Sequence, residues 1–241
     1  MRLLLDGDIL MFITSFSNEV ATEVEPGYWT WYCDFNKVTQ GIKESLDYYK
    51  NLLDADTVTI CLSDDQENFR KQILGTYKEK RLRVKRPLVL KEVRRYLLEE
   101  LDGYCLPNLE GDDVLGILAT DPNDEEDKII VSIDKDMQCI PGQLWYQNEV
   151  KHITPAEANR YHLYQTLTGD ITDGYTGIPG IGAKKAEKIL GDNPTWEAVV
   201  KAYEAAGLTE DDALIQARCA KILTYEDYDP VQQKPILWSP R

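Results

Sequence analysis

Three short runs of apolar residues, each followed by a carboxylate, mark the first half of the chain. Residues 3–5 precede Asp6, residues 57–62 precede a Ser-Asp-Asp triplet, and residues 129–133 precede Asp134. Unbroken apolar runs of this length are typical of strands that are buried on both faces of a sheet. We therefore predict three buried strands, each with an acid at its carboxyl end.

Between these runs, apolar residues recur at steps of three and four, which is the spacing of an amphipathic helix. Residues 34–53 show it with Asp34 as the N-cap, residues 87–101 show it with Pro87 in the first turn, and a third such segment begins near residue 110. Strands that alternate with helices predict an α/β fold with a central, mostly parallel sheet. Ligands of such sheets bind outside the carboxyl ends of the strands, where the acids lie.

The second part of the chain has a different pattern, with helices and no clear alternation of strands. A segment rich in Gly, Asp and Pro, from residue 169 to residue 182, interrupts the helical spacing. We predict an α/β domain over residues 1–150 and a helical region over residues 151–241. Its helices are expected at residues 154–168, 183–190, 195–206 and 211–223.

Composition excludes several classes of protein and of site. The 241 residues are 43% apolar, as in a globular domain, and no apolar run approaches the roughly 18 residues that span a bilayer. The start of the chain lacks the apolar core of a signal peptide, so we expect a cytoplasmic protein. Five scattered cysteines without a C-x-x-C pair and two distant histidines disfavour a disulfide framework, a zinc site and a Ser-His-Asp triad. Any metal bound here is expected to be a hard ion with oxygen ligands.

Acids gather at the predicted strand ends and in two further segments. Two acids that are two residues apart project to the same side of an extended chain, and acids three apart are neighbours on a helical turn. The acids could be separate surface charges or helix caps. If instead they meet at one edge of the sheet, they repel one another unless cations lie between them. Mg²⁺ or Mn²⁺ suits such ligands, and two such ions can activate a water and stabilise the leaving oxygen of a phosphodiester. The candidates are Asp6, Asp64, Asp65, Glu110, Asp112, Asp113, Asp134, Asp136, Asp170 and Asp173.

Basic residues concentrate in one stretch, although the net charge of the chain is −15. Residues 70–95 hold eleven Lys and Arg against two Glu, so this stretch carries +9 and the remaining residues carry −24. Such a stretch can hold a phosphate backbone through counterion release, while the acidic remainder repels DNA from other faces. The alternative is a solvated helix face. The candidates for contact with DNA are Arg70, Lys71, Tyr77 (as a stacking platform), Lys80, Arg83, Lys85 and Arg86.

The segment from Gly177 to Ala186 is the most specific local signal of the sequence. Its three glycines match neither a P-loop nor a dinucleotide-binding fingerprint, because the Gly-Lys-Ser/Thr ending and the preceding strand are missing. A glycine-rich turn between helices presents backbone N–H groups and a helix N-terminus to a phosphate, whereas the plain alternative is a connection between two helices. The candidate residues are Gly177, Gly180, Gly182, Lys184 and Lys185.

Together these motifs resemble the 5′-nuclease (flap endonuclease-like) family, and within it the short 5′→3′ exonucleases of tailed bacteriophages. The resemblance spans nearly the whole chain and rests on residues 6–8, 68–81, 110–113, 132–136 and 169–175. It implies a PIN-like α/β domain followed by a helix–three-turn–helix region that binds duplex DNA. It also implies that the basic span from about residue 78 to residue 95 forms a short arch over the active site.

The resemblance further implies a role for each candidate residue. Lys78 contacts the scissile phosphate, Arg81 assists it, and Tyr77 stacks on a terminal base. The glycine turn of this family commonly holds a monovalent cation, K⁺, through backbone carbonyls. One divalent metal takes Asp6, Glu110, Asp112 and either Asp64 or Asp65, which both fit, and the other takes Asp134, Asp136 and Asp173, with Asp113 and Asp170 close by through water.

We therefore predict an enzyme, a two-metal-ion 5′→3′ exodeoxyribonuclease that hydrolyses phosphodiesters at the 5′ ends of duplex DNA and also RNA in RNA·DNA hybrids. By resemblance its role is primer removal in phage DNA replication, as a monomer in the host cytoplasm without membrane contact. A structure-specific flap endonuclease and a non-catalytic DNA-binding replication protein are the alternatives. A phosphatase of the haloacid-dehalogenase type, with Asp6 as nucleophile and Asp8 as acid, leaves the basic span and the glycine turn without a function.

Overall fold

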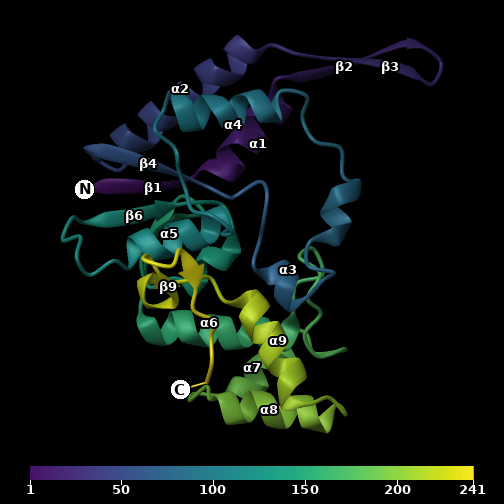
Figure 1. The fold of residues 1–241 in the computed structure, drawn as a ribbon, viewed down its shortest axis with the longest axis vertical. Coiled ribbons are helices and arrows are strands. Elements are labelled where there is room, and N and C mark those ends of the chain that lie inside the picture. The colour runs from purple at the N-terminus through teal and green to yellow at the C-terminus, as the bar shows by residue number, and fades with distance from the viewer. Residues whose placement is uncertain (241) are drawn as a thin grey trace.

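A six-stranded sheet forms the centre of the molecule in the computed structural model, which describes residues 1–240. The strand order is β5-β4-β1-β6-β7-β8, and neighbouring strands are parallel except for the last pair. This arrangement confirms the predicted α/β class with a mostly parallel sheet (Figure 1). The strands are β1 (Arg2–Asp6), β4 (Thr57–Leu62), β5 (Tyr104–Cys105), β6 (Lys128–Val131), β7 (Gly142–Tyr146) and β8 (Glu149–Ile153).

Helices cover both faces of the sheet because the central strands are apolar on both sides. In β1, Leu3 and Leu5 belong to one apolar layer and Leu4 belongs to the other, as the alternation of side chains along a strand requires. The first layer is formed by α1 (Gly7–Ser17), α2 (Phe35–Leu52) and α4 (Leu90–Glu99). The second is formed by α5 (Gly111–Ala119), the 3₁₀ turn η2 (Lys135–Cys139) and the first turn of α6 (Pro155–Thr168).

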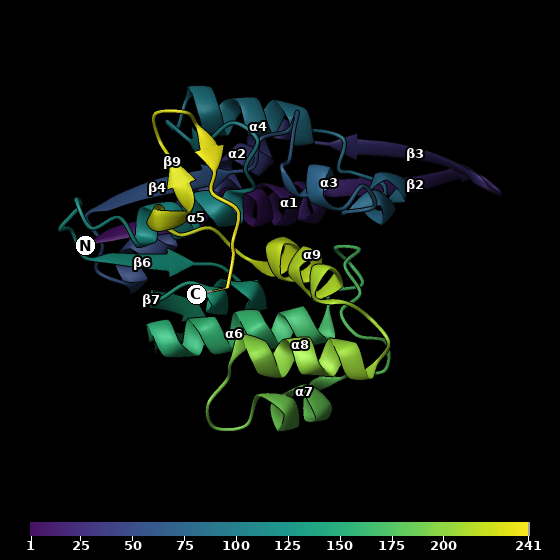
Figure 2. The same cartoon turned by 60° about the horizontal axis from the view of Figure 1, so that its bottom comes forward.

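The caps expected from the sequence define where two of these helices begin. The Asp34 carboxylate accepts from backbone N–H groups of the first turn of α2, and Thr154 caps α6 in a capping box with Glu157. Beyond α6 the predicted helices are confirmed, and they pack with α6 around a separate apolar cluster (Figure 2). These helices are α7 (Ala183–Leu190), α8 (Trp196–Ala205) and α9 (Glu210–Ala220). The expected domain boundary at residue 150 lies inside β8, and the division into two domains stays a prediction.

Two hairpins are not predicted by the pattern of the sequence. The turn between β7 and β8 consists of Gln147 and Asn148, which both adopt the left-handed conformation that a two-residue hairpin needs. The other hairpin, β2 (Glu19–Glu25) and β3 (Tyr28–Cys33), projects from the body of the molecule (Figure 1). We call it the ribbon. Its residues 20–32 are all exposed, so no buried face imposes the alternation by which a strand is recognised.

The part of the basic stretch that is not packed into the body of the molecule is shorter than the sequence indicates. It runs from α3 (Arg70–Ile73) through the 3₁₀ turn η1 (Glu79–Arg83) to α4. Because Val93 and Leu97 of α4 are fully buried in the first layer, residues 90–95 do not belong to the expected arch, and we use the term arch for residues 79–89. Within residues 1–240, no helix is both long enough and apolar enough to cross a bilayer. The last elements are η3 (Tyr225–Asp227), β9 (Tyr228–Asp229) and β10 (Lys234–Pro235).

Candidate active site

The carboxyl ends of β1 and β6 bring two of the predicted acids together. Asp6, the last residue of β1, caps α1 and accepts from the Ile9 N–H at 3.0 Å. Ser132, which follows β6, donates to Asp6 Oδ2 at 2.7 Å and accepts from the Asp134 N–H at 3.0 Å. A buried hydroxyl to which sequence reasoning assigns no role therefore joins the ends of two adjacent strands.

The acids at this edge raise one another's pKa values. Burial, followed by the charges of Asp8 and Asp134, raises the pKa of Asp6 to about 7. Burial and then Asp134 raise the pKa of Asp136 to about 7, and burial together with Asp6 holds the pKa of Asp112 well above its usual range. We call Asp6, Asp112, Asp134 and Asp136 the acid edge. Its charge is incompletely neutralised, which is the electrostatic condition for binding a cation.

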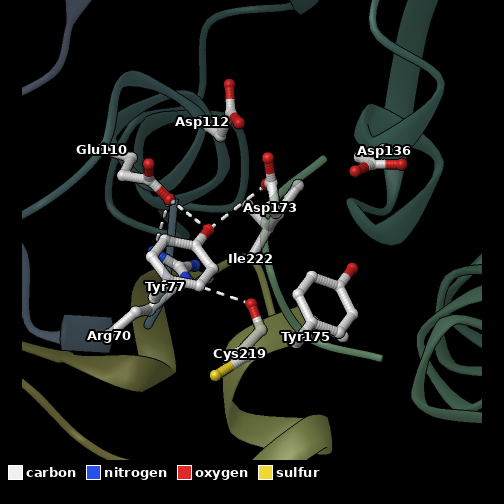
Figure 3. Close-up of a pocket in the computed structure, with 10 residues that line it drawn as sticks. Arg70, Tyr77, Glu110, Asp112, Asp136, Asp173, Tyr175, Cys219 and Ile222 are labelled. Atoms are coloured by element: carbon white, nitrogen blue, oxygen red, sulfur yellow. Dashed lines mark hydrogen bonds and ion pairs between the residues drawn. The ribbon is translucent and has the colours of Figure 1, made fainter. Parts of the chain in front are cut away.

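Glu110 differs from the acid edge because cations surround it. It is the N-cap residue of α5, its carboxylate pairs with the Lys78 ammonium, and Arg70 Nη1 lies 3.1 Å from Oε2. The Tyr77 hydroxyl donates to the same oxygen at 2.8 Å (Figure 3). Burial opposes ionisation of Glu110, but Lys78 and Arg70 outweigh it and lower its pKa to about 2. Glu110 is therefore an ionised carboxylate at neutral pH.

Asp173 connects the helical region to the same group of residues. Arg81 pairs with its carboxylate, and Lys78 Nζ lies 3.5 Å from Oδ2. The Tyr77 hydroxyl also lies 3.4 Å from Asp173 Oδ2, so its single proton is shared between the two acids and one tyrosine bridges Glu110 and Asp173. The Lys78 N–H also donates to the Asp173 carbonyl at 2.7 Å. Lys78, which directly precedes the arch, is thus tied to Asp173 by its backbone and to both acids by its side chain.

The turn over residues 170–175 holds the last of the predicted acids. Asp170 accepts from the Thr172 N–H at 2.7 Å and lies 3.4 Å from Lys135 Nζ. Gly174 has a φ of 84°, and a Cβ at this position would come within 2.8 Å of the Thr76 carbonyl oxygen. The close approach of this turn to the segment before Lys78 therefore requires glycine.

A small cavity lies between these acids. Its volume is about 20 Å³, enough for about one water molecule, and Glu110, Asp112, Asp136 and Asp173 line it (Figure 3). Across residues 1–240, no group of three or more His, Cys, Asp and Glu side chains is arranged to hold a metal ion by itself. The donors are nevertheless crowded carboxylate oxygens, which hard divalent ions prefer. The residues present fit such ions if water completes the coordination.

Arg70 is a buried structural residue and not a contact for DNA, since 2% of its surface is exposed. Its guanidinium donates to both Asp113 oxygens at 2.7 Å and to the carbonyls of Cys219 and Lys221. Asp113 also accepts from the Leu223 N–H at 3.0 Å, so its carboxylate is turned to Arg70 and not to the acid edge. The predictions that Arg70 contacts DNA and that Asp113 belongs to the metal site both need correction. Arg70 pairs instead with Asp113, which lies 43 positions later in the chain.

Tyr77 is buried as well, with 3% of its surface exposed. Its ring packs in a small apolar cluster with Tyr175, Cys219 and Ala220. The prediction that Tyr77 stacks on a terminal base is therefore wrong. Its hydroxyl instead fixes two carboxylates relative to each other.

The acids that follow β4 are bonded to groups outside the acid edge. Asp64 accepts from a backbone N–H of the loop before α5, and Asp65 Oδ2 lies 3.6 Å from Arg94 Nε. Asp8, which is not among the predicted metal ligands, lies behind the edge and accepts from the Ser63 N–H at 2.9 Å and the Ser63 hydroxyl at 2.5 Å. In the sequence, Asp8 could have been found from its position two residues after Asp6. Of the two alternatives, Asp64 is the one adjacent to the segment that leads to Glu110.

The glycine turn and the arch differ in what they expose. Gly180 and Gly182 are exposed, and Gly182 begins α7 without a capping side chain. Gly177 is buried and its N–H donates to Gln216, so its expected contact with DNA is replaced by a structural role. Lys185 Nζ donates to the Gly180 carbonyl at 2.9 Å. Among the predicted DNA contacts, the exposed cations are Lys71, Lys80, Arg83, Arg86, Lys184 and Lys185, together with Lys85, which pairs with Glu19.

Known proteins share this sequence and this fold. The profile of the 5′-3′ exonuclease N-terminal, resolvase-like domain matches residues 2–163. The chain is 30% identical to the exodeoxyribonuclease of Enterobacteria phage T3 and to the exonuclease of Escherichia phage T7, with 99% of this chain and 93% of each relative covered. The T5 5′-exonuclease solved with zinc bound has a similar fold, with a TM-score of 0.68, 15% identity and coverage of 91% of this chain and 89% of that one. The T5 flap endonuclease solved with DNA and metal ions gives a TM-score of 0.61 at 15% identity, over 91% of this chain and 92% of that one.

These similarities extend over the whole site. The profile covers the sheet, both helical layers and the acid edge, and the phage relatives also cover the turn that carries Asp170 and Asp173. The fold of the T5 protein, a PIN-like domain with a helical region, is the one predicted from the sequence. The chain therefore belongs to the 5′-3′ exonuclease family, and it is a 5′-3′ nuclease.

Proposed function

We propose that this chain is a metal-dependent 5′→3′ exonuclease that shortens duplex DNA from its 5′ ends. The observation that carries the proposal is the acid edge, where Asp6, Asp112 and Asp136 have raised pKa values next to the cations Lys78 and Arg81. Crowded carboxylates beside fixed cations suit a substrate that brings negative phosphate and is cleaved with the help of divalent metal ions.

Two divalent ions, Mg²⁺ or Mn²⁺, are proposed to bind at the acid edge. When bound, such ions activate a water and neutralise the oxygen that leaves the phosphodiester. The T5 exonuclease structure that holds zinc, and the T5 complex with DNA and metal ions, support metal dependence. The proposed ligands are Asp6, Glu110, Asp112 and Asp64 on one side, and Asp134, Asp136, Asp173 and, through water, Asp170 on the other.

The chain's own residues orient the reacting groups. Lys78 and Arg81 are held at the site before substrate arrives, by their ion pairs with Glu110 and Asp173. We propose that both cations contact the scissile phosphate, because preorganised positive charge stabilises the charge that develops there. Tyr77 keeps the two acids at a constant separation through its hydroxyl.

The duplex is proposed to lie along the exposed cations of the arch and the start of α7. Lys80, Arg83 and Arg86 face solvent, and salt-sensitive contacts with the phosphate backbone follow from such residues. At the start of α7, Gly182 leaves backbone N–H groups without a capping side chain, and Lys184 adds positive charge. The T5 flap endonuclease complex with DNA supports a DNA-binding role for this fold.

Finer features of the function are proposed on the resemblance alone. They are cleavage of RNA in RNA·DNA hybrids, primer removal in phage replication, a monomeric state and action in the host cytoplasm. A K⁺ ion at the glycine turn belongs to the same group. It would compete with Lys185, whose ammonium already donates to the Gly180 carbonyl.

One gel experiment tests the proposal. The protein is incubated with duplex DNA labelled at the 5′ or the 3′ end, with Mg²⁺ or with EDTA. We expect immediate release of very short 5′-labelled product and slow shortening of the 3′-labelled strand, both abolished by EDTA. A substrate with a 5′ flap separates the alternative, since release of the intact flap as the main product would make the protein a flap endonuclease.

A matched pair of variants tests whether the acid edge is the site. We expect Asp134→Asn/Asp136→Asn to abolish cleavage while DNA binding persists. The control Asp47→Asn/Glu204→Gln removes the same charge from exposed positions on α2 and α8 and is expected to cleave normally. Full cleavage by the Asp134→Asn/Asp136→Asn variant would refute the proposed site.

A further inference from the structure

An acidic residue at the base of the ribbon contacts the arch. Glu19 begins β2, and its side chain is only 3% exposed although the rest of the ribbon is open to solvent. Its carboxylate pairs with the Lys85 ammonium and accepts from the Leu88 N–H at 2.8 Å. Lys85 also lies over the ring of Trp31, which belongs to β3. The second half of the arch is therefore held by the ribbon.

The first half of the arch is held independently, by the active site. The Lys78 N–H bonds the Asp173 carbonyl, and the Lys78 and Arg81 side chains pair with Glu110 and Asp173. Between these two attachments Val84 is 59% exposed. Figure 1 shows the arch passing from the base of the ribbon, beside α4, down to α3. The arch is thus a strap fixed at both ends.

The chemistry of the ribbon indicates what this contact is for. Residues 19–33 carry three Glu and no Lys or Arg, so the ribbon is not built to hold a phosphate backbone. Glu19 differs from Glu23 and Glu25, whose surroundings are exposed, because it is covered and carries two donors from the arch. Burial opposes ionisation of Glu19, but the Lys85 ammonium and the Leu88 N–H outweigh it and lower the pKa of Glu19, so the carboxylate is ionised.

We propose that Glu19 is a positioning residue that holds the arch in place, so that the arch cations are ordered before DNA binds. The proposal rests on the proposed function in one respect, namely that exposed arch cations contact the phosphate backbone. An ordered arch loses less conformational entropy when substrate binds, so the contact favours binding of DNA. It leaves the chemical step unchanged, because Lys78, Arg81 and the acid edge are held by other contacts.

Glu19→Gln tests the proposal, with Glu23→Gln as its matched control. Both variants remove one negative charge from the same strand, but Glu23 accepts only from the Gly27 N–H within the ribbon among the bonds of the described chain. We expect Glu19→Gln to raise the KM for 5′-labelled duplex DNA about tenfold, with kcat nearly unchanged, because one charge-assisted contact is weakened. Glu23→Gln is expected to match the parent protein in both constants.

Limited trypsin digestion of the protein without DNA gives a second readout that needs no nuclease activity. In the second half of the arch trypsin can cleave after Arg83 and Lys85, whereas Pro87 protects the bond after Arg86. We expect Glu19→Gln to be cut at these two bonds about tenfold faster than Glu23→Gln, since a released segment opens more often. Trp31→Ala is expected to act in the same direction, and Trp31→Phe, which keeps a ring under Lys85, to restore the parent rate.

The possible outcomes show whether or not Glu19 holds the arch in place. Equal trypsin rates and equal KM values for Glu19→Gln and Glu23→Gln would overturn the proposal. A fall in kcat without a change in KM would overturn it too, because the arch would then act on chemistry. If the parent protein fails to cleave DNA, the proposed function fails, while the trypsin rates still report whether Glu19 holds the arch.

Discussion

Replacing Arg70 with Met tests the structural role of this residue. Arg70 is predicted from the sequence to contact DNA, but the structure makes it the buried partner of Asp113. Arg70 is 2% exposed and donates to both oxygens of Asp113, which is 0% exposed. Met fills a similar volume but leaves Asp113 as a buried carboxylate without its cation. Removing one partner of a buried ion pair costs about 3–5 kcal/mol, so we expect the free energy of unfolding to fall by about 4 kcal/mol.

The assay is urea unfolding followed by tryptophan fluorescence, in EDTA so that metal binding does not contribute. Lys71→Met is the matched control, because Lys71 is the exposed neighbour of Arg70 and carries the same charge. Exposed substitutions usually change stability by no more than about 0.5 kcal/mol. A double variant, Arg70→Met/Asp113→Leu, removes the uncompensated charge and should recover part of the loss.

Two results would refute this reasoning. If Arg70→Met is as stable as Lys71→Met, Arg70 does not neutralise a buried acid. If, in addition, Arg70→Met weakens DNA binding more than Lys71→Met and reduces its salt dependence, Arg70 is the DNA contact that its place in a basic stretch indicates.

Three further predictions concern the site. Tyr77→Phe keeps the ring but removes the hydroxyl between two acids, so we expect kcat to fall about tenfold at unchanged KM, whereas a stacking role would raise KM instead. In EDTA, the raised pKa values of Asp6 and Asp136, about 7, mean that the folded protein holds protons that the unfolded chain releases. Stability should then fall as pH rises from about 4 to 7, with a lower Tm near pH 8 than near pH 6, and saturating Mg²⁺ should remove the difference; a Tm in EDTA that rises with pH over this range would contradict it. Lys184→Ala should weaken binding equally for all DNA sequences and reduce the slope of log affinity against log salt by about 1, and an unchanged slope would exclude a phosphate contact there.

The features predicted correctly from sequence are those that local rules determine. Strands buried on both faces need unbroken apolar runs, and parallel strands place their carboxyl ends at one edge of a sheet. This is why Asp6 and Asp134 could be expected to meet, and Ser132 joins them. Helix caps such as Asp34 and Thr154 were also predictable, since a cap bonds the helix that directly follows it.

The features that could not be predicted depend on contacts between distant segments. Tyr77 looks like a surface aromatic among basic residues, and only the fold places its hydroxyl between Glu110 and Asp173. The ribbon has no buried face, so its strands lack the alternation that identifies a half-buried sheet. Asp64 and Asp65 could not be told apart because the turn after β4 decides which one faces the loop before α5.

The basic stretch illustrates why charge counts and binding sites differ. Its cations divide into groups that summed charge does not separate: Arg70 neutralises a buried acid, Lys78 and Arg81 pair with acids of the site, and Lys85 pairs with Glu19. Each phosphate contact contributes about 0.9 to the slope of log affinity against log salt. The slope measured for the parent protein should therefore be well below the value that eleven contacts would give, because cations already committed to carboxylates release few counterions on binding DNA.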